Sequence, residues 1–81
     1  MTEVKFAEGA LGGIKALDRP QDIAALRAAR DELRANPTAG VLQAGGLYRL
    51  YVAVDGDPER ISILYRLDGD EVLVVWVLAG P

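Results

Sequence analysis

The period of the hydrophobic pattern changes once along this 81-residue chain, near Thr38, and this change most restricts the fold. Before it, apolar residues recur every three or four positions, which is typical of amphipathic helices. After it, they alternate with a period of two, which is typical of strands with one buried face. A helical half followed by a stranded half predicts an α+β domain in which helices pack on a small antiparallel sheet.

Three elements are predicted in the first half. Residues 2–7 alternate weakly around Val4 and Phe6 and predict a short strand. Residues 8–17 have helical spacing but contain three glycines, so this helix depends on tertiary packing. Residues 21–35 are rich in alanine, leucine and arginine and predict the stronger helix.

The junction between the two helices contains signals for the start of the second. Asp18 is a candidate cap, Pro20 suits a first helical turn, and Gln21 stands three positions after the aspartate, as in a capping box. Asn36 and Pro37 end the helix.

Three strands separated by glycine-containing turns are predicted in the second half. The predicted strands are residues 41–54, 60–67 and 71–78. The first is interrupted by Ala44-Gly45-Gly46, which indicates a bulge or bend. Residues 55–59 predict a loop, and residues 68–70 predict a tight turn. With no repeat and no linker, residues 1–81 are expected to form a single domain.

The last predicted strand has no polar face. Residues 72–78 read Val-Leu-Val-Val-Trp-Val-Leu, which favours a central strand covered on both sides. Tyr65 and Trp76 are both expected to pack as apolar side chains. Because two helices can cover only one face of the sheet, a partner or a second copy is expected to cover the other.

Cysteine and histidine are absent, and this narrows the chemistry available to the chain. Disulfides, thiol nucleophiles, the usual zinc sites and the commonest general base are excluded, so no cofactor or metal is expected. Any reaction would use arginines, tyrosines or carboxylates, or a nucleophile supplied by the substrate. The sequence contains no apolar run long enough for a membrane span and no apolar signal segment after Met1, so a cytoplasmic protein is expected.

The charge balance opposes simple attraction to nucleic acid. Nine basic and twelve acidic residues give a formal charge of −3 and a pI near 4.7. Local clustering still matters, because six of the seven arginines fall into two groups. One group lies on the second predicted helix, and the other on the predicted strands.

The helical group consists of Arg27, Arg30 and Arg34, which lie within a narrow arc beside the apolar stripe of residues 21–35. Asp31, one turn after Arg27, is positioned to neutralise it. The stripe is interpreted either as a solvated helix face or as a surface that faces an anionic partner.

Two short patterns give this sequence a resemblance to a known family. They are the helix junction Lys15-Ala16-Leu17-Asp18-Arg19-Pro20, and the pairing of Leu47-Tyr48-Arg49-Leu50 with Ile63-Leu64-Tyr65-Arg66-Leu67-Asp68-Gly69-Asp70-Glu71-Val72. In element order and in these patterns the chain resembles the RelE/ParE toxin superfamily over nearly its whole length. The resemblance implies a sheet of about four strands with two N-terminal helices packed on it, in the order β-α-α-β-β-β.

The resemblance also implies a function. Members of this superfamily are toxins of bacterial type II toxin–antitoxin systems, each neutralised by an antitoxin protein encoded beside it. RelE-like members cut messenger RNA on the ribosome, whereas ParE-like members inhibit DNA gyrase. RelE-like cleavage by the substrate's own 2′-hydroxyl, with cations that stabilise the phosphorane-like charge, needs no histidine. We therefore expect a RelE-like toxin, with gyrase inhibition as the alternative and the enzymatic activity open.

The family's nuclease positions can be carried over to this sequence. Its Tyr-basic-aliphatic-basic pattern places the two basic positions on Arg49, which stays cationic, and on Tyr51, which does not. The next arginine of the family falls on Ser62, where Arg60 is a nearby substitute expected on the same sheet face. The predicted catalytic set is Arg49, Tyr51, Arg60 and Arg66.

Further nuclease residues of the family lie after its last strand. That segment would follow Leu78, where this sequence has Ala79-Gly80-Pro81. The nuclease site is therefore expected to be incomplete.

An antitoxin would fold over the second predicted helix, with aliphatic anchors and acidic residues. The predicted contact residues are Leu26, Arg27, Arg30, Leu33 and Arg34.

Two other functions remain open at this stage. One is a non-catalytic binding or assembly module, such as a homodimer, that uses the apolar sheet face and the groove beside the helix predicted over residues 21–35. The other is a carboxylate hydrolase using Asp55, Asp57 and Glu59, which are better explained as a solvated turn.

Overall fold

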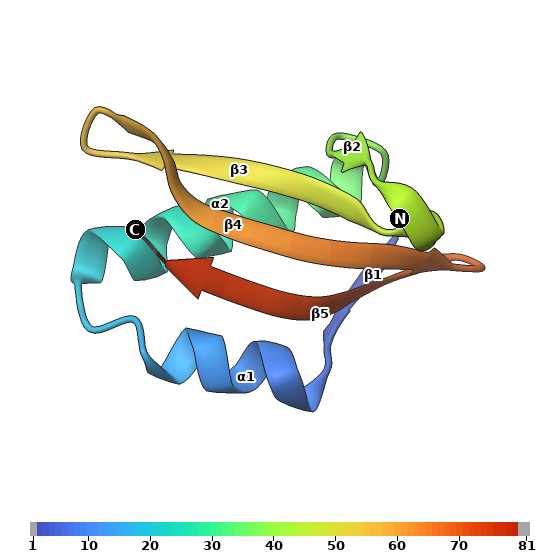
Figure 1. Cartoon of the computed structure of the whole chain (residues 1–81), viewed down its shortest axis with the longest axis horizontal. Coiled ribbons are helices and arrows are strands. Elements are labelled where there is room, and N and C mark those ends of the chain that lie inside the picture. Colours follow the sequence, from blue (N-terminus) through green and yellow to red (C-terminus); the bar gives the residue numbers. More distant parts are fainter. Residues whose placement is uncertain (1, 80–81) are drawn as a thin grey trace.

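Two α-helices and five strands form the part of the chain that the computed structural model describes, residues 2–79. In chain order the elements are β1 (Glu3–Phe6), α1 (Glu8–Lys15), α2 (Pro20–Ala35), β2 (Val41–Leu42), the 3-10 turn η1 (Ala44–Gly46), β3 (Tyr48–Val54), β4 (Asp57–Asp68) and β5 (Glu71–Ala79) (Figure 1). The predicted α+β class and the order of strand, two helices and meander are confirmed.

The strands form one mixed sheet in the order β1-β5-β4-β3-β2. β1 is parallel to β5, and the other pairs are antiparallel. The sheet has five strands rather than about four, because the segment predicted as residues 41–54 divides at η1 into β2 and β3. Gly45 and Gly46 both have a φ of 77°, a conformation that glycine adopts without strain.

A two-residue turn joins β3 to β4. Val54 pairs with Asp57, and the residues between them, Asp55 and Gly56, have φ values of 51° and 84°. Positive φ at both positions is the geometry of a type I′ hairpin turn, whose twist matches that of the strands. The predicted loop over residues 55–59 was therefore too long, since residues 57–59 already belong to β4.

The N-cap residue of α2 is Arg19 rather than the predicted Asp18. Proline restricts the residue before it to extended geometry, so the residue preceding Pro20 takes the N-cap position. Arg19 has φ −90° and ψ 129°, and no side chain in the described part of the chain caps this helix terminus by a hydrogen bond. The placement of Pro20 in the first turn is confirmed.

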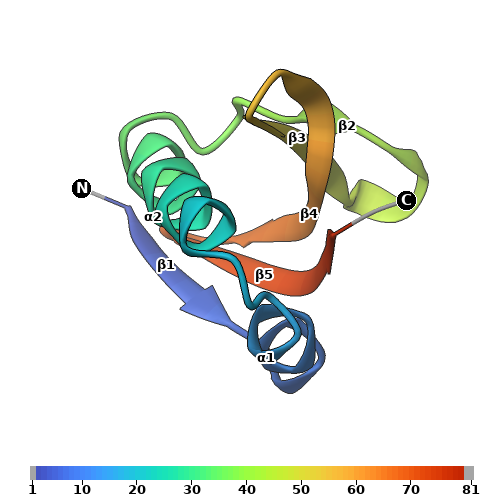
Figure 2. The ribbon, with the colours of Figure 1, turned by 90° about the vertical axis from the view of Figure 1, so that its left-hand side faces the viewer.

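The hydrophobic core lies between α2 and the sheet. Figure 2 shows the strands curving around α2. Leu26, Ala29 and Leu33 of α2 are buried against the sheet. The strand residues buried in the same core are Val4, Val54, Ile61, Ile63, Tyr65, Val72, Val74 and Val77.

α1 lies beside β5 and apart from α2 (Figure 2). Gly13 lets its backbone approach β5 closely, because a Cβ at this position would collide with the carbonyl oxygen of Val77. α1 thus runs along the part of β5 that follows its pairing with β1. No helix within residues 2–79 is long and apolar enough to cross a membrane.

β5 has a neighbour on each side, which confirms its central position. Within residues 2–79 only one face of β5 is covered, and Trp76 and Leu78 on the other face are 47% and 48% exposed. The coverage of this second face by a partner stays a prediction. The cause is geometric: successive strand residues point to opposite faces, and α2 covers only one of them.

Candidate functional site

The face of the sheet turned away from α2 carries the predicted nuclease residues Arg49 and Tyr51. We define this open face by its cross-strand rows: Arg49, Leu64 and Trp76 in one row, Tyr51, Ser62 and Leu78 in the next, and Arg66 two positions along β4 from Leu64. Tyr51 is opposite Ser62 in the register, so the two residues share this face. The open face therefore combines large apolar side chains with arginines.

Arg49 and Tyr51 contact each other directly. Nη1 of Arg49 donates a hydrogen bond of 3.2 Å to the Tyr51 hydroxyl, and the Arg49 Cζ lies 5.8 Å from the centroid of the Tyr51 ring. Nε of Arg49 is buried and has no hydrogen-bond partner within residues 2–79. Neither Arg49 nor Arg66 forms an ion pair with a carboxylate in this range. Their charge is therefore available to an anionic ligand.

Arg60 does not join this pair, contrary to the sequence expectation. Its Nε and Nη2 donate hydrogen bonds of 3.4 and 3.2 Å to the carboxylate of Asp22, which is 1% exposed at the start of α2. The hydrogen bond to Asp22 raises the pKa of Arg60, against the opposing effect of burial. The β3–β4 register shifts between Val52 and Val54, opposite Arg60, and this irregularity accompanies the turn of the arginine toward α2.

A polar network extends from this ion pair to the β3–β4 turn. Nε of Arg19 lies 3.8 Å from Asp22, and Nη2 of Arg19 lies 2.9 Å from Asp55. Gln21 also donates a hydrogen bond to Asp55, at 3.1 Å. The network joins the start of α2 to the sheet, so we assign Arg60 a structural position.

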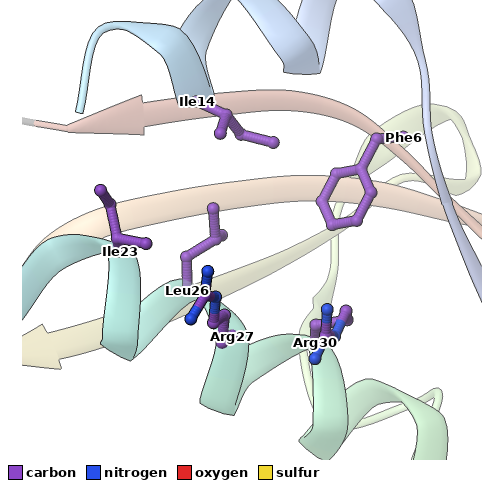
Figure 3. A pocket seen from close by; sticks show the side chains of 6 residues that line it. All are labelled: Phe6, Ile14, Ile23, Leu26, Arg27 and Arg30. Atoms are coloured by element: carbon purple, nitrogen blue, oxygen red, sulfur yellow. The ribbon is translucent and has the colours of Figure 1, made fainter.

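A groove beside α2 forms a second candidate surface (Figure 3). Its volume is about 230 Å³. The groove is lined by Phe6, Ile14, Ile23, Leu26, Arg27 and Arg30. Apolar walls next to two arginines fit a partner segment that has both apolar and acidic side chains.

The structure separates the predicted antitoxin contacts into three groups. Leu26, Arg27 and Arg30 line the groove. Leu33 is 1% exposed and belongs to the core, so it offers no surface to a partner. Arg34 does not line the groove and lies 3.5 Å from Asp31.

Asp31 does not neutralise Arg27, as the sequence had predicted. It pairs with Arg30 at 3.3 Å and with Arg34 at 3.5 Å, and Arg27 forms no ion pair within residues 2–79. An arginine four residues before an acidic residue is the less favourable orientation of such a pair on a helix.

Sequence reasoning missed several residues of both surfaces. Trp76 was expected to pack, but it lies half-exposed on the open face. Asp22 gave no sign of being the partner of Arg60, 38 positions away. Phe6 was identified only as an apolar position of the first predicted strand, and its place in the groove depends on segments far apart in the sequence. The packing predicted for Tyr65 is confirmed by its 0% exposure.

Comparisons with known proteins show which solved structures share this fold. No protein-family model and no curated protein matches the sequence. Several solved structures match the whole chain. Three of them are the intact E. coli RelBE toxin–antitoxin complex (TM-score 0.75, 19% identity, 99% of that chain), the isolated E. coli RelE toxin (0.76, 16%, 86%) and the chromosomal ParDE toxin–antitoxin system of P. aeruginosa (0.73, 18%, 98%).

These likenesses concern the fold, because the sequence identities are below 20%. They extend over the complete chain and include both branches that the sequence patterns resemble. The chain therefore has the fold of the RelE/ParE toxin superfamily.

Proposed function

We propose that this chain is the toxin of a bacterial type II toxin–antitoxin pair, and that it arrests growth by cutting messenger RNA on the ribosome. The full-length likeness to RelE and ParE toxins supports the first part. The observation that carries the second is the contact between Arg49 and Tyr51 on the open face, where neither side chain is bound to a carboxylate within residues 2–79.

The reaction proposed for this pair uses a nucleophile from the substrate. The 2′-hydroxyl oxygen of a ribose attacks the adjacent phosphorus, and the bond from phosphorus to the 5′-oxygen of the next nucleotide breaks. The products are a 2′,3′-cyclic phosphate and a 5′-hydroxyl. The proton of the 2′-hydroxyl passes to water, and the departing 5′-oxygen gains a proton.

Arg49 and Tyr51 have distinct roles in this scheme. The guanidinium of Arg49 stabilises the additional negative charge on the phosphorane-like transition state. The hydroxyl oxygen of Tyr51 accepts a hydrogen bond from Arg49, so its own proton is free to be donated to the departing oxygen. Arg66, on the same face, adds positive charge along the RNA backbone.

The test is expression of the chain alone in a bacterium, with growth recorded and message cleavage mapped on ribosomes. We expect arrest and cuts with the wild type. Arg49→Ala and Tyr51→Phe should each reduce the rate of cutting, by about 100-fold or more for the arginine. Arg34→Ala, which removes an arginine outside both surfaces, is the matched control and should keep the activity.

The possible outcomes separate the candidate functions. Arrest with intact messages and inhibited DNA supercoiling would replace RNA cleavage by a ParE-like action on gyrase. Growth without arrest, at a protein level equal to that of the control, would refute the toxin assignment and favour a binding module.

The proposed partner is an antitoxin protein that occupies the groove of Figure 3. Leu26 and its apolar neighbours would receive aliphatic side chains, and Arg27 and Arg30 would pair with carboxylates. Two of the similar structures come from toxin–antitoxin systems, which supports a partner of this kind.

A further inference from the structure

The side chain of Trp76 on the open face packs against α1. A Cβ at Gly9 of α1 would lie 3.2 Å from two atoms of the six-membered ring of Trp76, so the ring rests against a helix position that has no side chain. Across the strands Trp76 pairs with Leu64, which in turn pairs with Arg49. The indole is thus supported by α1 on one side, while almost half of its surface is exposed.

Packing alone does not account for an aromatic side chain here. The core lies on the opposite face, and the exposed tryptophan adds nothing to the contacts between α2 and the sheet. Together with Tyr51, which is 45% exposed, it gives the open face two accessible aromatic rings. Exposed aromatic rings gathered on one surface are typical of a binding site.

Charge on the same face indicates the class of ligand. Arg49 and Arg66 have no carboxylate partner within residues 2–79, although the chain as a whole carries a formal charge of −3. Two strand spacings separate Arg49 from Trp76, about 10 Å, which one or two nucleotides can span. A ligand that offers anions and flat apolar rings at this spacing is a single-stranded nucleic acid with unstacked bases.

We propose that Trp76 stacks on a base of single-stranded RNA while Arg49 and Arg66 contact the flanking phosphates. The inference rests on the proposed nuclease function and adds a substrate-binding residue that the sequence patterns do not contain. A duplex cannot use this site, because its bases are stacked on each other. Trp76 is therefore a determinant of affinity for single strands.

The experiment uses the only tryptophan of the chain as its own probe. A short single-stranded oligoadenylate is titrated into the full-length protein at low salt while indole fluorescence is recorded, and the affinity of each variant is measured from the anisotropy of the labelled oligonucleotide. Stacking should quench the wild-type fluorescence. Trp76→Leu should weaken binding about fivefold or more, and Trp76→Phe should weaken it less, because phenylalanine keeps an aromatic ring.

Three controls accompany the titration. Leu67→Ala removes an exposed leucine of β4 that lies next to Arg66 but on the other side of the strand, and it should leave the affinity unchanged. Thermal unfolding of each variant establishes that it is folded. A matching RNA duplex should cause no quenching.

Three results would overturn the inference: an unchanged affinity in Trp76→Leu, equal quenching by the duplex, or no binding of the single strand by the wild type. If Trp76→Leu keeps its RNA affinity but no longer binds a co-expressed antitoxin, the indole ring belongs to a protein interface instead. If RNA binds through Trp76 but messages stay intact in cells, the proposed nuclease function fails while this inference stands.

Discussion

At the scale of single residues, the Tyr65 hydroxyl is a polar group in the hydrophobic core that has a hydrogen-bond partner. The side chain is 0% exposed, its ring stacks on Tyr48 with centroids 5.2 Å apart, and its oxygen accepts a hydrogen bond of 2.9 Å from the backbone N–H of Gly40. Gly40 needs its lack of a side chain, because a Cβ would lie 2.8 Å from that oxygen. Burial raises the pKa of Tyr65 above its ordinary value of 10.0.

Removing the Tyr65 hydroxyl tests both its hydrogen bond with Gly40 and its raised pKa. Tyr65→Phe should lower the free energy of unfolding by about 1 kcal/mol near neutral pH, because the N–H of Gly40 loses its acceptor. Since the folded-state pKa is raised, the stability linked to Tyr65 is complete below pH 10 and is lost as the pH rises beyond that value. Urea unfolding from pH 8 to 11 should give a steeper alkaline loss for the wild type than for the variant; equal slopes would contradict the linkage.

At the scale of elements, the approach of α1 to β5 depends on one glycine of a neighbouring pair. Gly13→Ala should lower the free energy of unfolding by about 1–3 kcal/mol, because the new Cβ would collide with the Val77 carbonyl and force the two elements apart. Gly12→Ala is the matched control. Nothing lies within 4 Å of its added Cβ, so better helix propensity should raise stability by up to about 1 kcal/mol. Effects of the same sign in thermal unfolding would refute this packing.

A second prediction at this scale concerns the ion pair that joins α2 to β4. Asp22→Ala removes the buried carboxylate that pairs with Arg60. This substitution should lower the Tm by more than Asp31→Ala, because Asp31 pairs with Arg30 and Arg34 at the surface. The control should stay within about 3 °C of the wild type. If Asp22→Ala also stays within that range, the network does not hold the two elements together.

At the scale of the whole molecule, the two candidate surfaces offer different chemistry to a ligand. The groove beside α2 offers apolar walls and two arginines, and the open face offers aromatic rings and arginines. Reversing both groove charges, Arg27→Glu with Arg30→Glu, should weaken the proposed antitoxin complex at least about tenfold at low salt and less at high salt. Isothermal titration against the co-purified antitoxin measures the change.

Arg34→Glu is the control for that titration, because the residue lies on the same helix outside the groove. Equal losses for the control and the double variant would mean that general charge, rather than the groove, attracts the partner.

Local patterns in the sequence predict the elements of this protein, because hydrophobic period, turn residues and proline act within a few positions. The two helices and the strand meander followed from such patterns and the family resemblance.

Contacts between distant segments determine where several of the candidate side chains lie. The parallel pairing of β1 with β5, the turn of Arg60 toward Asp22 and the exposure of Trp76 each depend on segments far apart in the sequence. A register shift in one strand pair redirects a side chain, and one helix covers one face of a sheet and leaves the other open. Such contacts between distant segments form only when the whole chain packs, so no local pattern encodes them.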